Sequence, residues 1–141
     1  MKLQVTVEEL PMAQDVRGWV VEPVQEGHLS NMRNAHVVWT LPGHVRGNHV
    51  HHKTTETLVV VGPALVCWEE DGMRQDRHVP EGRAWRFVFP PGVPHAIQNT
   101  GSSPIVMIAF TDQLHDPVHP DTQRHVLLHP SATAMVSCSS P

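Results

Sequence analysis

Short apolar runs separated by turn residues dominate the pattern of this chain. Clusters of Gly, Pro, Asn and Asp, such as PPGVP and NTGSSP, punctuate it. No long run with apolar residues at i, i+3 and i+4 occurs before residue 120. Nine segments rich in β-branched or aromatic residues predict strands: 3–7, 17–22, 35–41, 47–52, 56–62, 64–70, 83–89, 95–99 and 104–110. This pattern predicts an all-β sandwich or barrel.

The C-terminal part of the chain has a different pattern. In DPVHPDTQRHVLLHP, residues 116–130, Asp121 or Thr122 can cap a short helix that Pro130 would end. Residues 131–141, SATAMVSCSSP, have the composition of a frayed or disordered tail. Because no repeat or linker interrupts the sequence, we predict a single domain over residues 1–130, followed by a disordered tail.

Composition narrows the range of partners. The length of 141 residues fits one domain, and a hydrophobic content of 40% is enough for a core. The net charge is −4 with acids and bases interspersed, so no basic stripe indicates nucleic-acid binding. No apolar run approaches the roughly 20 residues that a membrane helix needs, and MKLQVTVEEL lacks the apolar core of a secretory signal. We expect a cytoplasmic protein whose partner is a small-molecule substrate rather than nucleic acid or a membrane.

Histidine is unusually frequent, with 12 residues against two lysines. Cysteine offers less chemistry. Cys67, in ALVCW, is predicted to be a buried free thiol, and Cys138 lies in the tail. Two cysteines so placed make neither a disulfide framework nor a thiolate zinc site. The question is therefore whether some of the histidines have a geometry that demands a metal ion or a proton transfer.

The segment GNHVHHKTTETLVVVG, residues 47–62, concentrates this chemistry. Side chains alternate between the two faces of a strand, so His49 and His51 point the same way while His52 points away. After a short connection, Glu56 opens the next strand. We expect the same face of two adjacent strands to offer two imidazoles and one carboxylate.

A second segment, PPGVPHAIQN (residues 90–99), places His95 directly after a tight turn, at the start of another strand. Inside a small barrel His95 can meet the two imidazoles and the carboxylate of the first segment. Three neutral imidazoles and one carboxylate suit Zn²⁺, Fe²⁺, Mn²⁺, Ni²⁺ or Cu²⁺. A strand-borne site leaves coordination positions open, as in catalytic metal sites. The alternative is that these are polar barrel residues with no metal.

The two segments also carry a family resemblance. They read G-x-H-x-H-x4-E-x5-G and P-x-G-x-x-H-x-x-x-N, and in this order they resemble the two motifs of the cupin superfamily. The matching positions are Gly47, His49, His51, Glu56, Gly62, Pro90, Gly92, His95 and Asn99. One departure is Gly82, which lies further ahead of the second motif than is usual. The resemblance implies a double-stranded β-helix, or jelly-roll, barrel whose metal ligands are His49, His51, Glu56 and His95.

Residues 15–128 carry a narrower resemblance. DVRGWVVE resembles the opening of cupin enzymes that act on nucleotide-linked keto-sugars. LPGHVRGNHVHHKTTETLVVVGPALV and FTDQLHDPVHPDTQRHVLL resemble the C-terminal cupin domain of bifunctional capsular polysaccharide enzymes, in which the cupin holds a metal and epimerises a keto-sugar nucleotide. Because edge strands such as residues 3–7 need cover and cupins usually pair, we also predict a homodimer.

Residues beside the motifs have simpler alternatives. We predict catalytic roles for His49, His51 and Lys53, although a lysine in such a connection is usually just solvated. Arg46 can contact a substrate phosphate, because a planar guanidinium suits phosphate oxygens; a surface salt bridge is its alternative. The remaining C-terminal histidines are predicted to be surface residues: His115, His119, His125 and His129. The large aromatic residues are assigned to the core or a subunit interface: Trp39, Trp68, Trp85, Phe87 and Phe89.

Three functions fit this residue set. The first is a metal-dependent isomerase or epimerase of a keto-sugar. Tyrosine, which metal-free keto-sugar epimerases commonly use as an acid, is absent from the sequence, so a metal would have to polarise the ketone while a histidine or carboxylate moves the proton. The second is an iron-dependent dioxygenase, and the third a non-catalytic module that binds a small acid or sugar.

Overall fold

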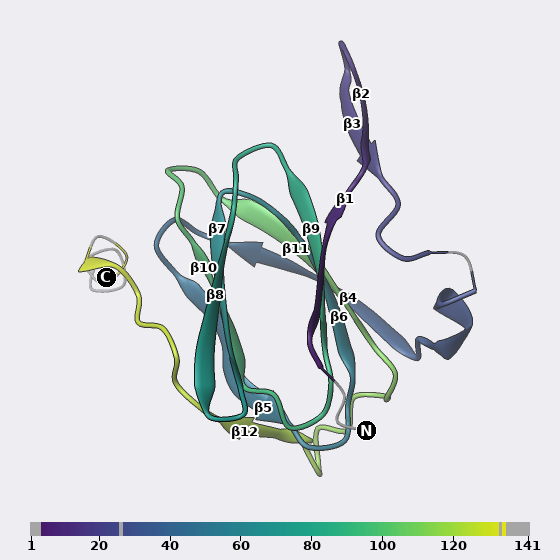
Figure 1. Cartoon of the computed structure of the whole chain (residues 1–141), viewed down its shortest axis with the longest axis vertical. Helices are drawn as coiled ribbons and strands as arrows, with labels where there is room; N and C mark the ends of the chain where they lie inside the picture. Colours follow the sequence, from purple (N-terminus) through teal and green to yellow (C-terminus); the bar gives the residue numbers. More distant parts are fainter. Residues whose placement is uncertain (1–3, 26, 133, 135–141) are drawn as a thin grey trace.

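The computed structural model describes residues 4–25, 27–132 and 134, which form β-strands and one short 3-10 helix at Leu29–Asn31. One antiparallel sheet has, in order, β1 (Thr6–Leu10), β9 (Ala84–Phe89), β6 (Glu56–Val61), β11 (Ile105–Thr111) and β4 (Asn34–Thr40). The other has β12 (Thr122–Arg124), β5 (Val45–His51), β10 (His95–Asn99), β7 (Ala64–Glu70) and β8 (Met73–Val79). A hairpin of β2 (Met12–Asp15) and β3 (Gly18–Val21) projects beyond the two sheets (Figure 1).

The hydrophobic core fills the space between the two sheets. One sheet contributes Leu58, Val60, Phe87, Phe89 and Met107, and the other contributes Ala64, Val66, Trp68, Val79 and Ile97. These side chains follow the period-two alternation of their strands. Burying each of the large ones contributes about 1.5–3 kcal/mol to the free energy of unfolding. The prediction of an all-β sandwich is therefore confirmed.

Every predicted segment overlaps an observed strand, but three strands, β2, β8 and β12, were not predicted from the sequence. The clearest case is β8, MRQDRHV, where every residue before Val79 is exposed. This strand pairs with β7 along its whole length. Backbone hydrogen bonds to a buried neighbour hold a polar edge strand in place, and they leave no apolar signal in its sequence.

The prediction of a short helix in residues 116–130 is wrong. Thr122–Arg124 form β12, which pairs antiparallel with β5. The side chain of Asn48 then accepts hydrogen bonds from the backbone N–H groups of Leu127 and Leu128 at 2.9 and 3.1 Å. Backbone groups that a helix would have paired internally thus find partners elsewhere in the fold.

The C-terminal tail is described only in part. The predicted disorder over 131–141 concerns residues that mostly lie outside the described part of the chain, as does Cys138.

Cys67 is fully buried and free, as predicted. Burial, together with a hydrogen bond to Asp76, raises the pKa of its thiol to about 12. No helix in the described residues is long and apolar enough to cross a membrane.

Candidate metal centre

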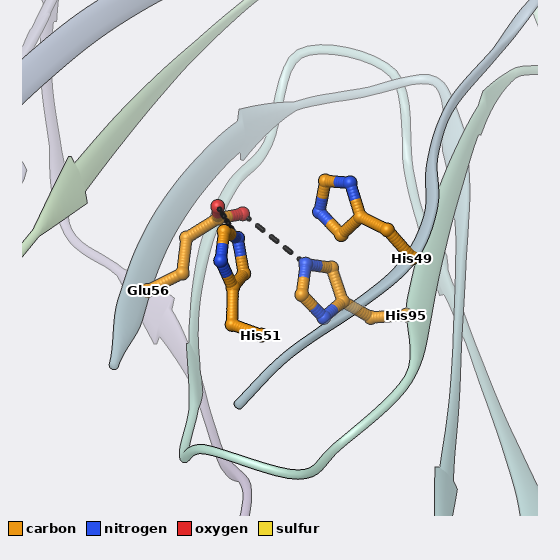
Figure 2. A group of neighbouring side chains, drawn as sticks. All are labelled: His49, His51, Glu56 and His95. Atoms are coloured by element: carbon orange, nitrogen blue, oxygen red, sulfur yellow. Dashed lines mark hydrogen bonds and ion pairs between the residues drawn. The ribbon is translucent and has the colours of Figure 1, made fainter. Parts of the chain in front are cut away.

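Three imidazoles and one carboxylate converge between the sheets (Figure 2). His49 and His51 lie on β5, Glu56 begins β6 and His95 begins β10. Their potential ligand atoms all lie within 4.8 Å of one another. Four side chains from three strands thus form one cluster, as the motif spacing predicts.

The carboxylate reaches the cluster from a different direction than expected. The sequence predicts that β5 and β6 are adjacent, but β5 pairs with β10 and β12, whereas β6 pairs with β9 and β11. The connection at residues 52–55 therefore crosses from one sheet to the other. Glu56 faces the histidines across the sandwich, because the chain enters the opposite sheet before the next strand starts.

A bulge in β5 brings His49 and His95 together. His95 is paired with His49, but the next residue, Ala96, is paired with Gly47, so Asn48 is the extra residue. Gly47 and Asn48 have φ angles of 80° and 55°. A Cβ on Gly47 would lie 2.8 Å from the carbonyl oxygen of His95. Only glycine permits this close approach of β5 to β10.

The carboxylate of Glu56 contacts the rings of two histidines of the cluster, His51 and His95. Its Oε2 lies 3.2 Å from His51 Nε2, and its Oε1 lies 3.3 Å from His95 Nε2. Burial raises the pKa of this carboxyl, but the hydrogen bonds with His51 and His95 outweigh burial and leave the pKa below its ordinary value. Glu56 therefore stays a carboxylate at neutral pH and can act as an anionic ligand.

The ring of His95 is fixed from two sides. Its Nδ1 lies 3.0 Å from the carbonyl oxygen of Val93, to which it donates a hydrogen bond. Phe89 stacks on the ring with centroids 4.1 Å apart and an interplanar angle of 2°. Because Nδ1 is held by this carbonyl, Nε2 is the nitrogen directed at the cluster, and it would give up its contact with Glu56 to bind a metal ion.

The donor set fits a divalent ion. His49 Nε2 is buried and has no hydrogen-bond partner among the residues that the structure describes, an arrangement that costs about 1–3 kcal/mol. Burial, followed by the charge of the nearby His95, lowers the pKa of His49 to about 4. Its ring is therefore neutral at physiological pH, and a bound cation would satisfy its lone pair.

A cavity of about 230 Å³ opens onto His49, His51 and Glu56. Its walls include three histidines that were not predicted at the site: His36, His115 and His119. His115 and His119 are exposed, as predicted, but they also line the cavity. Among the described residues that line the cavity, none is lysine or arginine. No short motif marks these residues, because β4 and the loop after β11 bring them from distant parts of the chain.

The other predicted site residues lie apart from the cavity. Lys53 is exposed and is not among the residues that line it. Arg46 is also exposed, and its Nη2 donates a hydrogen bond to the carbonyl oxygen of Trp39 at 2.7 Å. His52, directly after β5, is exposed and lies outside the cluster, as predicted, with Nε2 3.1 Å from Gln123 Oε1.

Comparisons with solved structures match this architecture. CapF, a capsular polysaccharide assembling protein from Staphylococcus aureus, shares 26% identity over 84% of this chain with a TM-score of 0.63, and this chain spans only 34% of CapF. The sugar 3,4-ketoisomerase QdtA from Thermoanaerobacterium thermosaccharolyticum, solved with TDP, has 14% identity, coverage of 89% of this chain and 90% of its own, and a TM-score of 0.67. A dTDP sugar isomerase from Desulfovibrio desulfuricans has 18% identity and a TM-score of 0.71, and the match covers 92% of this chain and 86% of that protein.

The sequence itself gives a family assignment. A search of curated proteins finds no match, but the family model of the polysaccharide biosynthesis C-terminal domain matches residues 13–123. The all-β sandwich is that of the cupin ketoisomerases, so the predicted cupin fold is confirmed. The chain therefore belongs to the polysaccharide biosynthesis C-terminal domain family.

Proposed function

We propose that this protein is a divalent-metal-dependent isomerase or epimerase that acts on the keto-sugar part of a nucleotide-linked sugar. One observation carries the proposal: three residues of the four-residue cluster, His49, His51 and Glu56, line a cavity whose walls hold further histidines. His49, His51, Glu56 and His95 would hold the ion. The family match and the similarity to sugar isomerases support the substrate class.

The size of the cavity suits a sugar ring. Its volume of about 230 Å³ is below the roughly 300–1,000 Å³ typical of pockets that enclose drug-sized ligands. A nucleotide diphosphate would therefore extend beyond the cavity entrance. Asn34 and Gln113 line the walls, and their amides can hydrogen-bond to sugar hydroxyls and orient the ring.

The reaction needs a group that removes a proton beside the ketone and returns it. When bound, a divalent ion supplies a Lewis acid that polarises the carbonyl. His36, His115 and His119 are imidazoles outside the four-residue cluster, so their ring nitrogens are available for the proton. His119 is paired with Asp116, with Nδ1 3.3 Å from Oδ2, and this carboxylate favours the tautomer with the proton on Nδ1 and the lone pair on Nε2. In this proposal one of these histidines takes the acid role that tyrosine has in metal-free keto-sugar epimerases.

Hydrogen exchange tests the proposal directly. Protein stripped with a chelator and reloaded with Zn²⁺, Mn²⁺, Fe²⁺ or Ni²⁺ is incubated in D₂O with a panel of nucleoside-diphosphate 4-keto-sugars. Proton NMR then follows the α-proton of each sugar. We expect metal-dependent loss of one α-proton signal, followed by the isomerised sugar.

A matched pair of variants serves as a control. His51→Ala removes a cluster residue and should abolish exchange, whereas His52→Ala alters its exposed neighbour in the chain and should retain it. Absence of exchange across the panel with every metal would overturn the proposal. Because the same ligand set suits Fe²⁺ oxygen chemistry, oxygen consumption with the Fe²⁺ protein is measured in parallel. Consumption without α-proton exchange would assign the dioxygenase function instead.

A further inference from the structure

Asp121 lies just before β12 and reaches the connection between β5 and β6. Its carboxylate accepts hydrogen bonds from the backbone N–H of Lys53 at 3.0 Å, from the backbone N–H of Thr54 at 2.9 Å and from Thr54 Oγ1 at 2.7 Å. This connection joins His51, the last residue of β5, to Glu56, the first residue of β6. One carboxylate therefore holds the segment between two residues of the cluster.

The same carboxylate faces the ring of His51. Asp121 Oδ2 lies 3.6 Å from His51 Nδ1, a buried nitrogen that has no hydrogen-bond partner in the described part of the chain. On the other side of the ring, Nε2 lies 3.2 Å from Glu56 Oε2. The distance of 3.6 Å is longer than a hydrogen bond, and a movement of about 0.6 Å would close it.

His95 shows the same arrangement with a different outer partner. Its Nδ1 is held by the carbonyl oxygen of Val93 at 3.0 Å, while its Nε2 faces Glu56. A metal-bound histidine usually donates its second ring N–H to a carboxylate or carbonyl, which fixes the tautomer and the orientation of the ring. Asp121 is placed to do for His51 what the Val93 carbonyl does for His95.

We propose that Asp121 is a positioning residue of the metal centre: it keeps the proton of His51 on Nδ1 and directs Nε2 at the ion. This inference rests on the metal site of the proposed function. It adds a residue that is remote in sequence from both motifs. Its negative charge beside the cluster also favours a divalent cation.

The test compares Zn²⁺ affinity in three proteins, measured by competition with a chromophoric chelator. Asp121→Asn retains an oxygen for the connection but loses the carboxylate, and it should bind Zn²⁺ about 10–100-fold more weakly than wild type. Asp112→Asn is the matched control. Asp112 Oδ1 accepts a hydrogen bond from the Thr55 backbone N–H in the same connection at 2.9 Å, but the carboxylate faces no histidine of the cluster. Its affinity should stay within about twofold of wild type, as for an ordinary surface substitution.

A second measurement does not depend on the folding of a variant. Nitrogen-15 NMR of the Zn²⁺-loaded wild-type protein reports which nitrogen of His51 carries the proton. We expect Nδ1 to be protonated; an unprotonated Nδ1 would overturn the inference. Equal Zn²⁺ affinity of wild type and Asp121→Asn, or equal losses in both variants, would also overturn it while leaving the metal site intact. Failure of the wild type to bind Zn²⁺ or the other divalent ions would overturn the metal site and this inference together.

Discussion

Replacing Gly47 with alanine should damage both the fold and the metal centre. Gly47 has a φ of 80°, and a Cβ there would lie 2.8 Å from the carbonyl oxygen of His95 and 3.2 Å from Ala96 Cα. Both contacts are with backbone, so neither can be relieved by rotating a side chain. The strand β10 must therefore move away from β5, and it carries His95 with it.

The magnitude follows from two contributions. A left-handed conformation costs an alanine about 1–2 kcal/mol. Forcing an extra methyl group into a packed site typically costs a further 1–3 kcal/mol or so. Gly47→Ala should therefore lower the free energy of unfolding by about 2–5 kcal/mol in total. Because small domains unfold with about 5–15 kcal/mol, most of the variant should remain folded at 25 °C.

Gly82→Ala separates the two contributions. Gly82 has a φ of 70°, close to that of Gly47, but a Cβ there would meet nothing within 4 Å. Urea unfolding of the metal-free proteins gives each free energy of unfolding by linear extrapolation. Zn²⁺ affinity is measured on the same samples. We expect Gly82→Ala to lose about 1–2 kcal/mol and to bind Zn²⁺ normally, whereas Gly47→Ala loses more stability and binds Zn²⁺ at least about tenfold more weakly.

Two results would refute this reasoning. Equal losses of stability in the two variants would mean that the approach of β5 to β10 does not limit the fold. Wild-type Zn²⁺ affinity in Gly47→Ala would mean that the bulge does not set the position of His95.

The remaining predictions concern pH, the C-terminal segment and the oligomeric state. The pKa of His49, about 4 in the folded protein, lies below the ordinary 6.5, so the unfolded chain binds more protons between these values. The melting temperature of the metal-free protein should fall as pH drops from 6.5 to 4, and less steeply in His49→Gln. Asn48→Ala removes three hydrogen bonds to Leu127 and Leu128 and should lower the free energy of unfolding in urea by about 2–4 kcal/mol. A loss no larger than the roughly 1–2 kcal/mol that the left-handed φ of 55° costs an alanine would contradict the anchoring role. Trp39 is 58% exposed on the outer face of its sheet and should lie in the predicted dimer interface. Sedimentation should therefore show a dimer. The Trp39→Asp substitution should convert this dimer to a monomer, whereas Met73→Asp should not.

Local alternation explains why so much of the site was predictable. His49 and His51 are two residues apart on one strand, so their shared direction depends only on the geometry of the β-backbone. Their proximity to Glu56 was also predicted, but for an adjacent strand. The actual approach from the opposite sheet depends on where the connection at residues 52–55 leads, and the sequence of the connection does not specify it.

The C-terminal segment shows the opposite case. Its candidate capping residues favour a helix locally, yet Thr122–Arg124 pair with β5. The edge of β5 and the side chain of Asn48 supply hydrogen bonds that exceed the weak helix preference. This pairing also brings Asp121 beside His51, a contact that no local pattern predicts.

The sequence alone determined the all-β class and four side chains with the spacing of a metal site, because both follow from side-chain alternation and motif spacing within short segments. The tertiary structure alone decided which residues surround that cluster. His36, His115, His119 and Asp121 reach the cavity through strand pairings between distant segments, and such pairings are selected by the burial and hydrogen bonding of the whole fold.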